Sequence, residues 1–209
     1  MLHVEAVPAG ALPVLRRLMA MERMAGYALV GGTALSLRYG HRLSVDLDLF
    51  VNSGFDHAEV GKLLKDEFKE ELVHEPDNVN NIGVFCYVSG VKVDIVNYRH
   101  PLLEPVIVED GIRSYHDADI AAMKIQAILG RGKKKDFWDL YELLQHYSLQ
   151  QICDWHGKKY PDQMLAISIP NAISYFTEAN ASEDPVSLKG QTWEGIKRAI
   201  SQTVSDYLK

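Results

Sequence analysis

Two short motifs in the first quarter of the chain constrain its fold more than any other feature. Residues 29–35 are LVGGTAL, a pattern typical of a short strand that turns through two glycines into a helix. Residues 44–50 are SVDLDLF, an apolar run interrupted by two carboxylates. Because side chains alternate along a strand, Asp46 and Asp48 are expected to share one face. The residues that alternate with them and are expected to point into the core are Val45, Leu47 and Leu49.

These two carboxylates need a compensating positive charge, because like charges in an apolar run are costly to bury. A divalent cation is the simplest compensation, and carboxylate oxygens suit Mg²⁺. In the preceding turn, the backbone N–H groups of Gly31 and Gly32 and the hydroxyl of Thr33 favour a phosphate at a helix N-terminus. Arg42 and Ser44 are close enough in sequence to reach the same phosphates. Metal and phosphate together indicate nucleotide chemistry.

Composition favours a cytoplasmic protein with no membrane segment. No apolar run among the 209 residues approaches the roughly 18–20 residues of a membrane span, and residues 1–5 lack a signal-peptide pattern. Cys86 and Cys153 have apolar neighbours, which favours reduced thiols over a disulfide. The net charge of −6 argues against a general nucleic-acid coat. The basic run at residues 131–135 could contact a polyanion locally, although such a run is most often a solvated loop.

Hydrophobic periodicity divides the chain near residue 115. The first part, 1–115, is expected to form an α/β (α+β) domain with a mixed sheet, and the second, 116–209, an all-helical C-terminal domain. The strands expected in the first part are 27–30, 45–51, 83–88 and 91–98, and its helices are 11–25, 33–39 and 57–69. Residues 101–114 read as an irregular connector. The helices expected in the second part are 118–129, 136–147 and three or four more after 149, ending in 192–208.

A third carboxylate, Asp94, lies in the second strand of the expected hairpin. It shares one face with Lys92 and Val96, and it has apolar neighbours on both sides in the sequence. Taken alone, this pattern is better explained by an edge strand whose polar face meets water. Together with two carboxylates behind a Gly-Gly-Thr turn, it favours one site built from three carboxylates.

Three carboxylates suit the chemistry of nucleotidyl transfer. An acceptor attacks the α-phosphorus of a nucleoside triphosphate and pyrophosphate leaves, so the protein mainly positions the reactants and neutralises charge. Two Mg²⁺ ions about 4 Å apart do both. Asp46 and Asp48 would bridge these ions, and Asp94 would hold the one at the nucleophile and help take its proton.

A second polar cluster follows residue 120. Lys124 would by default be solvated, but its helical neighbours are apolar, which places it on or beside a buried face. An unpaired buried ammonium is costly, and a bound triphosphate would supply the missing negative charge. Arg131 and Lys135 follow in the basic run, and Asp136 and Asp139 complete the cluster. Asp136 has two interpretations: an N-cap for the next helix, or a polar group that holds Lys124 or the nucleotide.

These residues resemble a known family. Residues 31–35 and 42–50 resemble the first motif of the AbiEii/AbiGii-type nucleotidyltransferase toxins, within the DNA polymerase β-like superfamily. Asp94 in the sequence VKVDIV matches the second motif. Lys124 followed by residues 131–140 resembles the third and fourth motifs, so that the four motifs occur in the same order as in the family.

The resemblance, from about residue 27 to 144, implies a nucleotidyltransferase domain followed by a helical domain, with the active site between them. Members are typically toxins of bacterial toxin–antitoxin or phage-defence systems, which implies a cognate antitoxin and leaves GTP and CTP open as nucleotides. The residues expected to act in catalysis are Asp46, Asp48, Asp94, Lys124 and Asp136, with the first three as metal ligands. The residues expected to bind the nucleotide are Gly31, Gly32, Thr33, Arg42, Ser44, Lys124 and Arg131.

Three functions are compatible with these observations. The first is a Mg²⁺-dependent nucleotidyltransferase that modifies RNA, such as tRNA, or a protein, which the basic run at 131–135 favours. The second is the same chemistry on a small hydroxylated molecule such as an antibiotic, which the acidic net charge favours. The third is a nucleotide-binding module without turnover, which the intact carboxylates oppose. A steep loss of acceptor affinity with salt would indicate RNA.

Overall fold

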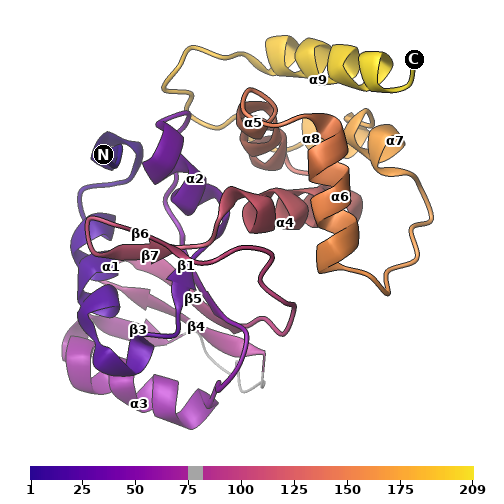
Figure 1. Ribbon diagram of the computed structural model, residues 1–209. Helices are drawn as coiled ribbons and strands as arrows, with labels where there is room; N and C mark the ends of the chain where they lie inside the picture. The colour runs from indigo at the N-terminus through magenta and orange to yellow at the C-terminus, as the bar shows by residue number, and fades with distance from the viewer. Residues whose placement is uncertain (75–81) are drawn as a thin grey trace.

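The computed structural model describes residues 1–74 and 82–209, which form a mixed sheet followed by a group of helices (Figure 1). The strands are β1 (Ala28–Leu29), β2 (Leu47–Val51), β3 (Leu72–His74), β4 (Gly83–Val88), β5 (Val91–Asn97), β6 (Ile107–Glu109) and β7 (Ile112–Ser114). The α-helices are α1 (Ala11–Ala20), α2 (Gly31–Tyr39), α3 (His57–Phe68), α4 (Asp117–Gly130), α5 (Lys134–Leu143), α6 (Leu149–Lys159), α7 (Ile169–Ile173), α8 (Thr177–Asn180) and α9 (Trp193–Tyr207). Short 3₁₀ helices span Val4–Ala6, Glu22–Met24 and Lys69–Glu71.

The order of the strands across the sheet is β3-β4-β5-β2-β1-β7-β6. β2 lies near the centre, parallel to β5 and antiparallel to β1. In the β2–β5 pair, Asp48 and Asp94 are register partners, because Leu47 pairs with Val93 and Leu49 pairs with Ile95. The topology therefore brings together two carboxylates that are far apart in the sequence.

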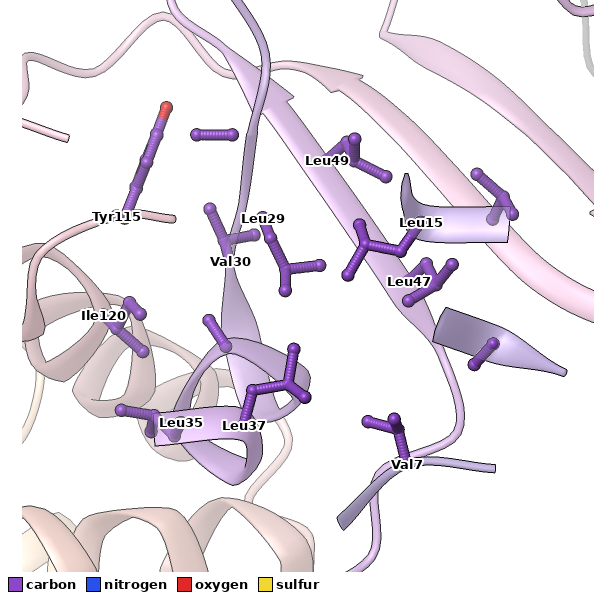
Figure 2. Packing of buried hydrophobic residues seen from close by; sticks show 14 of the residues in the cluster. Val7, Leu15, Leu29, Val30, Leu35, Leu37, Leu47, Leu49, Tyr115 and Ile120 are labelled. Atoms are coloured by element: carbon purple, nitrogen blue, oxygen red, sulfur yellow. The ribbon is translucent and has the colours of Figure 1, made fainter. Parts of the chain in front are cut away.

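One face of the sheet belongs to the hydrophobic core. Leu47 and Leu49 of β2 are almost completely inaccessible to solvent, and they join a cluster that includes Leu15 of α1 and Leu64 of α3. Figure 2 shows Leu29 of β1 in the same region, between the leucines of β2 and those of α2. Because the side chains of β2 alternate, Asp48 faces the other side of the sheet, toward α4.

Buried ion pairs fix the helices of the C-terminal region. The Lys159 ammonium on α6 donates to Asp119 of α4 at 2.7 Å and to the carbonyl of Pro101 at 2.8 Å, and both charged side chains are fully buried. Asp119 also accepts from the backbone N–H of Leu103 at 3.0 Å. These bonds connect α4 and α6 to residues 101–103, which follow β5, and they fix the orientation of α4 relative to the strands.

The fold class expected from the sequence is confirmed: a mixed sheet with helices, followed by a helical region. One expectation was wrong, because residues 101–114 contain the hairpin β6–β7 rather than only irregular chain. The two strands are joined through Asp110 and Gly111, which both have positive φ, so this is a tight hairpin turn. Val45 was also misplaced: β2 begins at Leu47, and the Val45 side chain is 56% exposed.

No helix in residues 1–74 and 82–209 has the length and apolar character needed to cross a membrane.

Candidate active site

A cavity of about 310 Å³ lies between the polar side of β2 and the helices α4 and α5. Sequence-predicted residues from both motif clusters line it. They are Gly31, Gly32, Arg42, Ser44, Asp46, Asp48, Lys124, Arg131 and Asp136. The structure therefore brings together residues that are separated by as much as 105 positions in the chain (136 − 31). The remaining residues that line the cavity are Val30, Phe50, Tyr98, Met123, Gln126, Ala127 and Lys135.

Asp48 of β2 lines this cavity, whereas its register partner Asp94 of β5 is not among the lining residues. Burial, with the nearby charges of Asp94 and Asp46, raises the pKa of Asp48 to about 6. The Asp94 carboxylate accepts from the Lys92 ammonium through Oδ2 at 2.6 Å, while its Oδ1 is buried without a hydrogen-bond partner. Two adjacent, partly buried carboxylates, of which only Asp94 has an ion-pair partner among the described residues, are poised to bind a cation.

Asp46 differs from Asp48 because it precedes β2 instead of belonging to it. Its side chain is 31% exposed, and Oδ2 lies 3.5 Å from the ammonium of Lys135 at the start of α5. Lys135 thus links the N-terminal motif to the basic run. Both side chains lie at the opening of the cavity.

The carboxylates fit a divalent metal in their chemistry, although they are not assembled as a metal site. In the part of the chain that the structure describes, no three His, Cys, Asp or Glu side chains form a group that could hold a metal ion. Lysines satisfy part of the charge instead: Lys92 pairs with Asp94, and Lys135 lies near Asp46. The unpartnered Oδ1 of Asp94 and the raised pKa of Asp48 are the features that a hard cation would relieve.

The glycine turn lets α2 begin directly against the carboxylates. Gly31 has φ +68°, a backbone conformation that favours glycine, and a Cβ atom there would lie 3.1 Å from Oδ2 of Asp48. At Gly32, a Cβ atom would lie 1.9 Å from a terminal nitrogen of Arg42. Both positions therefore require glycine, for conformation at the first and for space at the second.

Thr33 has a different role from the one expected. Its side chain is buried and does not line the cavity, and its hydroxyl is hydrogen-bonded to the Ser44 hydroxyl at 2.8 Å and to the carbonyl of Asp46. We therefore reassign Thr33 from phosphate contact to holding the segment that carries Ser44 and Asp46 against α2. The physical reason is that the first turn of α2 packs directly on this segment.

Arg42 is buried and held by a carboxylate for which the sequence suggested no role. Its guanidinium donates to the two oxygens of Asp139 on α5, at 2.7 and 2.9 Å. His41 also contacts Asp139, with Nε2 at 2.7 Å from Oδ1. Burial opposes ionisation of Asp139, but the charges of Arg42 and Lys124 outweigh it and hold its pKa well below the ordinary value.

Lys124 does not have the unpaired charge that the sequence suggested. Its ammonium lies 2.9 Å from Asp136 and 2.6 Å from Asp139, which face α4 from one side of α5. Although burial alone would lower the pKa of Lys124, these two carboxylates raise it above the ordinary value. Asp136 combines two roles: it holds Lys124, and it accepts from the backbone N–H of Lys133 as the third residue of α5 rather than as its N-cap.

A larger groove of about 710 Å³ adjoins the cavity and shares Arg42, Ser44, Asp46, Arg131 and Lys135 with it. The opposite side of the groove is formed by residues from the segment 178–186, which includes three acidic side chains.

That segment continues into one that binds the loop before β2. The backbone N–H of Leu43 donates to the carbonyl of Val186 at 2.9 Å, and that of Leu188 donates to the carbonyl of His41 at 3.0 Å. The C-terminal region therefore forms part of the surroundings of Arg42.

Three charged residues of the site were given no role from the sequence: Lys92, and Lys135 and Asp139, which belong to the second polar cluster. Lys92 could have been found, because it is two residues from Asp94 on the same strand face. Asp139 also had a signal, since it is three residues after Asp136 and therefore lies on the same side of the helix. No sequence signal indicated that Lys135 lies near Asp46, because this contact depends on how α5 packs against the sheet.

Comparison with known proteins agrees with this arrangement. The model of the family described as "Nucleotidyl transferase AbiEii toxin, Type IV TA system" matches residues 14–158. The uncharacterized protein aq_aa25 of Aquifex aeolicus (strain VF5) is 32% identical over 189 residues, which is 88% of each chain.

Two solved structures have a similar fold. JHP933 from Helicobacter pylori has a TM-score of 0.58 at 17% identity, covering 95% of this chain and 92% of its own. MenT4, the nucleotidyltransferase toxin Rv2826c from Mycobacterium tuberculosis H37Rv, has a TM-score of 0.56 at 13% identity, covering 93% and 82%. The family match extends over well more than half of the 209 residues and includes every predicted site residue. This chain is a nucleotidyltransferase and belongs to the AbiEii toxin family.

Proposed function

We propose that this nucleotidyltransferase transfers a nucleoside monophosphate from a nucleoside triphosphate to an RNA acceptor, in a Mg²⁺-dependent reaction. The observation that carries the proposal is the charge arrangement around one cavity. The carboxylates of Asp46 and Asp48 lie on the side of β2, and the cations of Lys124 and Arg131 lie on the side of α4. A triphosphate with its metal ions matches both sides, because it joins anionic oxygens to hard cations.

The triphosphate would be held by backbone and side-chain donors at one end of the cavity. The glycine turn at residues 31–32 opens α2, a nine-residue helix whose N-terminus favours anions. Arg42 and Lys124 offer N–H donors, and their ion pairs with Asp136 and Asp139 of α5 fix them before the substrate binds. Lys135 and Arg131 are more exposed and complete the cationic side. Because these donors are already positioned, little reorganisation is needed during the reaction.

Asp46, Asp48 and Asp94 are the residues that would hold Mg²⁺, which supplies neutralisation of the triphosphate charge and polarisation of the acceptor hydroxyl when it is bound. The acceptor oxygen forms a bond to the α-phosphorus while the bond from that phosphorus to the α–β bridging oxygen breaks, and pyrophosphate leaves. We expect the Asp94 carboxylate, the register partner of Asp48, to help take the proton of the acceptor hydroxyl.

RNA is the acceptor that the surroundings of the site favour. The larger groove opens onto Asp46 and carries Arg131, Lys133 and Lys135 along one side. These three cations would bind the phosphates near an RNA end, on the side of the groove opposite the acidic residues of segment 178–186. The family description, a toxin of a toxin–antitoxin system, also leads us to expect an antitoxin that counteracts this activity.

The test is incubation of the protein with each α-³²P-labelled nucleoside triphosphate, Mg²⁺ and total bacterial RNA. Asp46→Asn is the inactive comparison, and Asp66→Asn, an exposed aspartate on α3, is the matched control. We expect label on a discrete RNA band with the parent and with Asp66→Asn, and none with Asp46→Asn or with EDTA.

Other results would redirect or overturn the proposal. Label on the protein itself would indicate a protein acceptor. Label on neither, with transfer to an added small hydroxylated compound such as an aminoglycoside, would replace RNA by a small molecule. Equal labelling by Asp46→Asn would refute the assignment of the carboxylates.

A further inference from the structure

We propose that the end of the cavity formed by Phe50, Tyr98 and Gln126 binds the base of the nucleoside triphosphate, and that Gln126 sets the base preference. The inference rests on the proposed substrate and assigns a second subsite within the same cavity. It follows from three features: a gradient of polarity along the cavity, a fixed aromatic surface, and a side-chain amide held by a buried histidine.

The polarity gradient follows the direction of β2. Asp46, Asp48 and Phe50 face the cavity in turn, and alternate residues of a strand are about 6–7 Å apart. Asp46 is at the cationic end, near Lys135. Phe50 is therefore at the far end, beyond Asp48.

On α4, the uncharged side chains of Met123, Gln126 and Ala127 line the cavity together with Lys124. Arg131, which follows α4, is at the cationic end, and Met123 precedes it by eight residues, about 12 Å along a helix. Outside the segment 30–48, the uncharged residues that line the cavity are Phe50, Tyr98, Met123, Gln126 and Ala127. Gln126 is connected to Tyr98 through His156 and Tyr160, whose ring centroids lie 4.9 Å apart. A ligand with a polyanionic end and a planar, weakly polar end matches the direction of β2, from Asp46 to Phe50.

The aromatic surface at the far end is held rigidly. The rings of Phe50 and Tyr98 lie with centroids 5.0 Å apart and planes tilted by 38°. The Tyr98 hydroxyl is hydrogen-bonded to that of Tyr160, and its backbone N–H donates to the carbonyl of Val51 at 2.7 Å. A base that stacks here would lose little free energy to ordering of the protein, because the rings are already in place.

Gln126 adds a hydrogen-bonding group beside these rings. Its Oε1 lies 3.1 Å from Nε2 of His156, a residue of α6 that is almost fully buried. Burial lowers the pKa of His156, so the imidazole is neutral at pH 7 and donates from Nε2 to Gln126. With the oxygen engaged, the amide nitrogen of Gln126 is the group that meets the edge of the base, and His156 acts as its positioning residue.

The experiment compares binding of the four nucleoside triphosphates with binding of inorganic triphosphate, in Mg²⁺ without acceptor, by calorimetry. Phe50→Leu removes the ring but keeps an apolar side chain, and Phe50→Tyr keeps the ring. Tyr87→Leu, a partly exposed tyrosine on β4, is the matched control. We expect Phe50→Leu to raise the Kd of every nucleotide about tenfold. We expect Phe50→Tyr and Tyr87→Leu to bind like the parent.

Inorganic triphosphate separates this proposal from the proposed function. We expect its Kd to change by less than about twofold in all variants, which also shows that the cationic end remains folded. We expect Gln126→Leu to reduce the differences in Kd among the four nucleotides, with no effect on inorganic triphosphate.

Equal weakening of nucleotide and triphosphate binding by Phe50→Leu would overturn the base subsite, as would no weakening of either. Undiminished differences in Kd among the four nucleotides in Gln126→Leu would overturn the role of that residue. If the parent binds neither nucleotide nor triphosphate, the proposed function fails as well. If it binds triphosphate as tightly as nucleotides, only the base subsite fails.

Discussion

Lys124 on α4 and Asp139 on α5 form an ion pair with a nitrogen–oxygen distance of 2.6 Å, and the Asp139 side chain is completely buried. Asp139 also accepts two hydrogen bonds from Arg42, so a single carboxylate fixes cations from two separate parts of the chain. A pair of this kind contributes to stability only while all its members are present, because each is costly to bury alone. Asp139 therefore connects the stability of the protein to the geometry of its candidate active site.

Replacing Asp139 by Asn should lower the free energy of unfolding by about 3–5 kcal/mol at pH 7, because Arg42 loses its partner and Lys124 loses one of two. The pKa of Asp139 is held well below its ordinary value, so its stabilising contribution is complete above about pH 4 and is lost as the pH falls further. Urea denaturation at pH 7 and at pH 3 measures both effects. The difference between parent and variant should shrink at pH 3.

The exposed residue Asp154 of α6 provides the control, since Asp154→Asn should change the free energy of unfolding by less than about 1 kcal/mol. Equal stability of the parent and Asp139→Asn at pH 7 would contradict the ion-pair argument.

Asp48→Asn should lower the rate of nucleotidyl transfer by on the order of 10²-fold or more. The same variant should stabilise the metal-free protein. Burial, with Asp94 and Asp46, raises the pKa of Asp48 to about 6, so ionisation of this carboxyl reduces stability as the pH rises from about 4 through 6. The Asn variant avoids this loss. In EDTA its Tm should exceed that of the parent at pH 8, and the two should agree at pH 4. A variant that is less stable at pH 8 would show that the carboxylate is compensated in the free protein.

Gly32→Ala should destabilise the protein and reduce transfer, because the new methyl group would lie 1.9 Å from the guanidinium of Arg42. Arg42 is not free to move, since it is buried and bonded through two nitrogens to Asp139. Overpacking of this kind costs about 1–3 kcal/mol. Gly61→Ala is the matched control, because a Cβ atom at this position of α3 meets nothing within 4 Å. It should be neutral or slightly stabilising. Thermal unfolding measures the Tm of both variants, and similar Tm changes for Gly32→Ala and Gly61→Ala would refute the overpacking argument.

Lys135→Ala should weaken nucleotide binding while leaving the fold nearly unchanged. Its side chain is 41% exposed and its contact with Asp46 is 3.5 Å long, so its loss should cost less than about 1 kcal/mol of stability. In the complex the ammonium would face the phosphates, and we expect the KM for the nucleotide to rise about tenfold. Lys158→Ala, at an exposed position of α6, should alter neither quantity. An unchanged KM for Lys135→Ala would remove this lysine from the site.

The strands that carry Asp48 and Asp94 could be predicted, because apolar residues recur at every second position: Leu47, Leu49 and Val51 in β2, and Val91, Val93 and Ile95 in β5. The hairpin β6–β7 was missed because each strand has only three residues, too few for a period to show. Its turn through Asp110 and Gly111 was the available signal, since this dipeptide is typical of tight hairpins.

For the site, the residue types and motif positions were visible in the sequence, but the partners were not. Lys124 was placed correctly on a buried face of its helix, whereas its neutralisation by Asp136 and Asp139 depends on the packing of α4 against α5. The misassignment of Thr33 has a similar origin. Whether its hydroxyl meets a ligand or the chain itself depends on where Ser44 lies, and only the tertiary structure determines that distance.

The two backbone hydrogen bonds between residues 41–43 and residues 186–188 have a consequence for how this protein can be inactivated. Segment 186–188 is hydrogen-bonded to the loop that carries Arg42, so the candidate active site depends on more than the sheet and the helices beside it. Cleavage or the binding of another protein that displaces segment 186–188 would loosen Arg42, about 145 residues earlier in the chain (187 − 42). It would do so without contacting a carboxylate of the site. The contact between residues 186–188 and residues 41–43 therefore couples the C-terminal region to the position of Arg42.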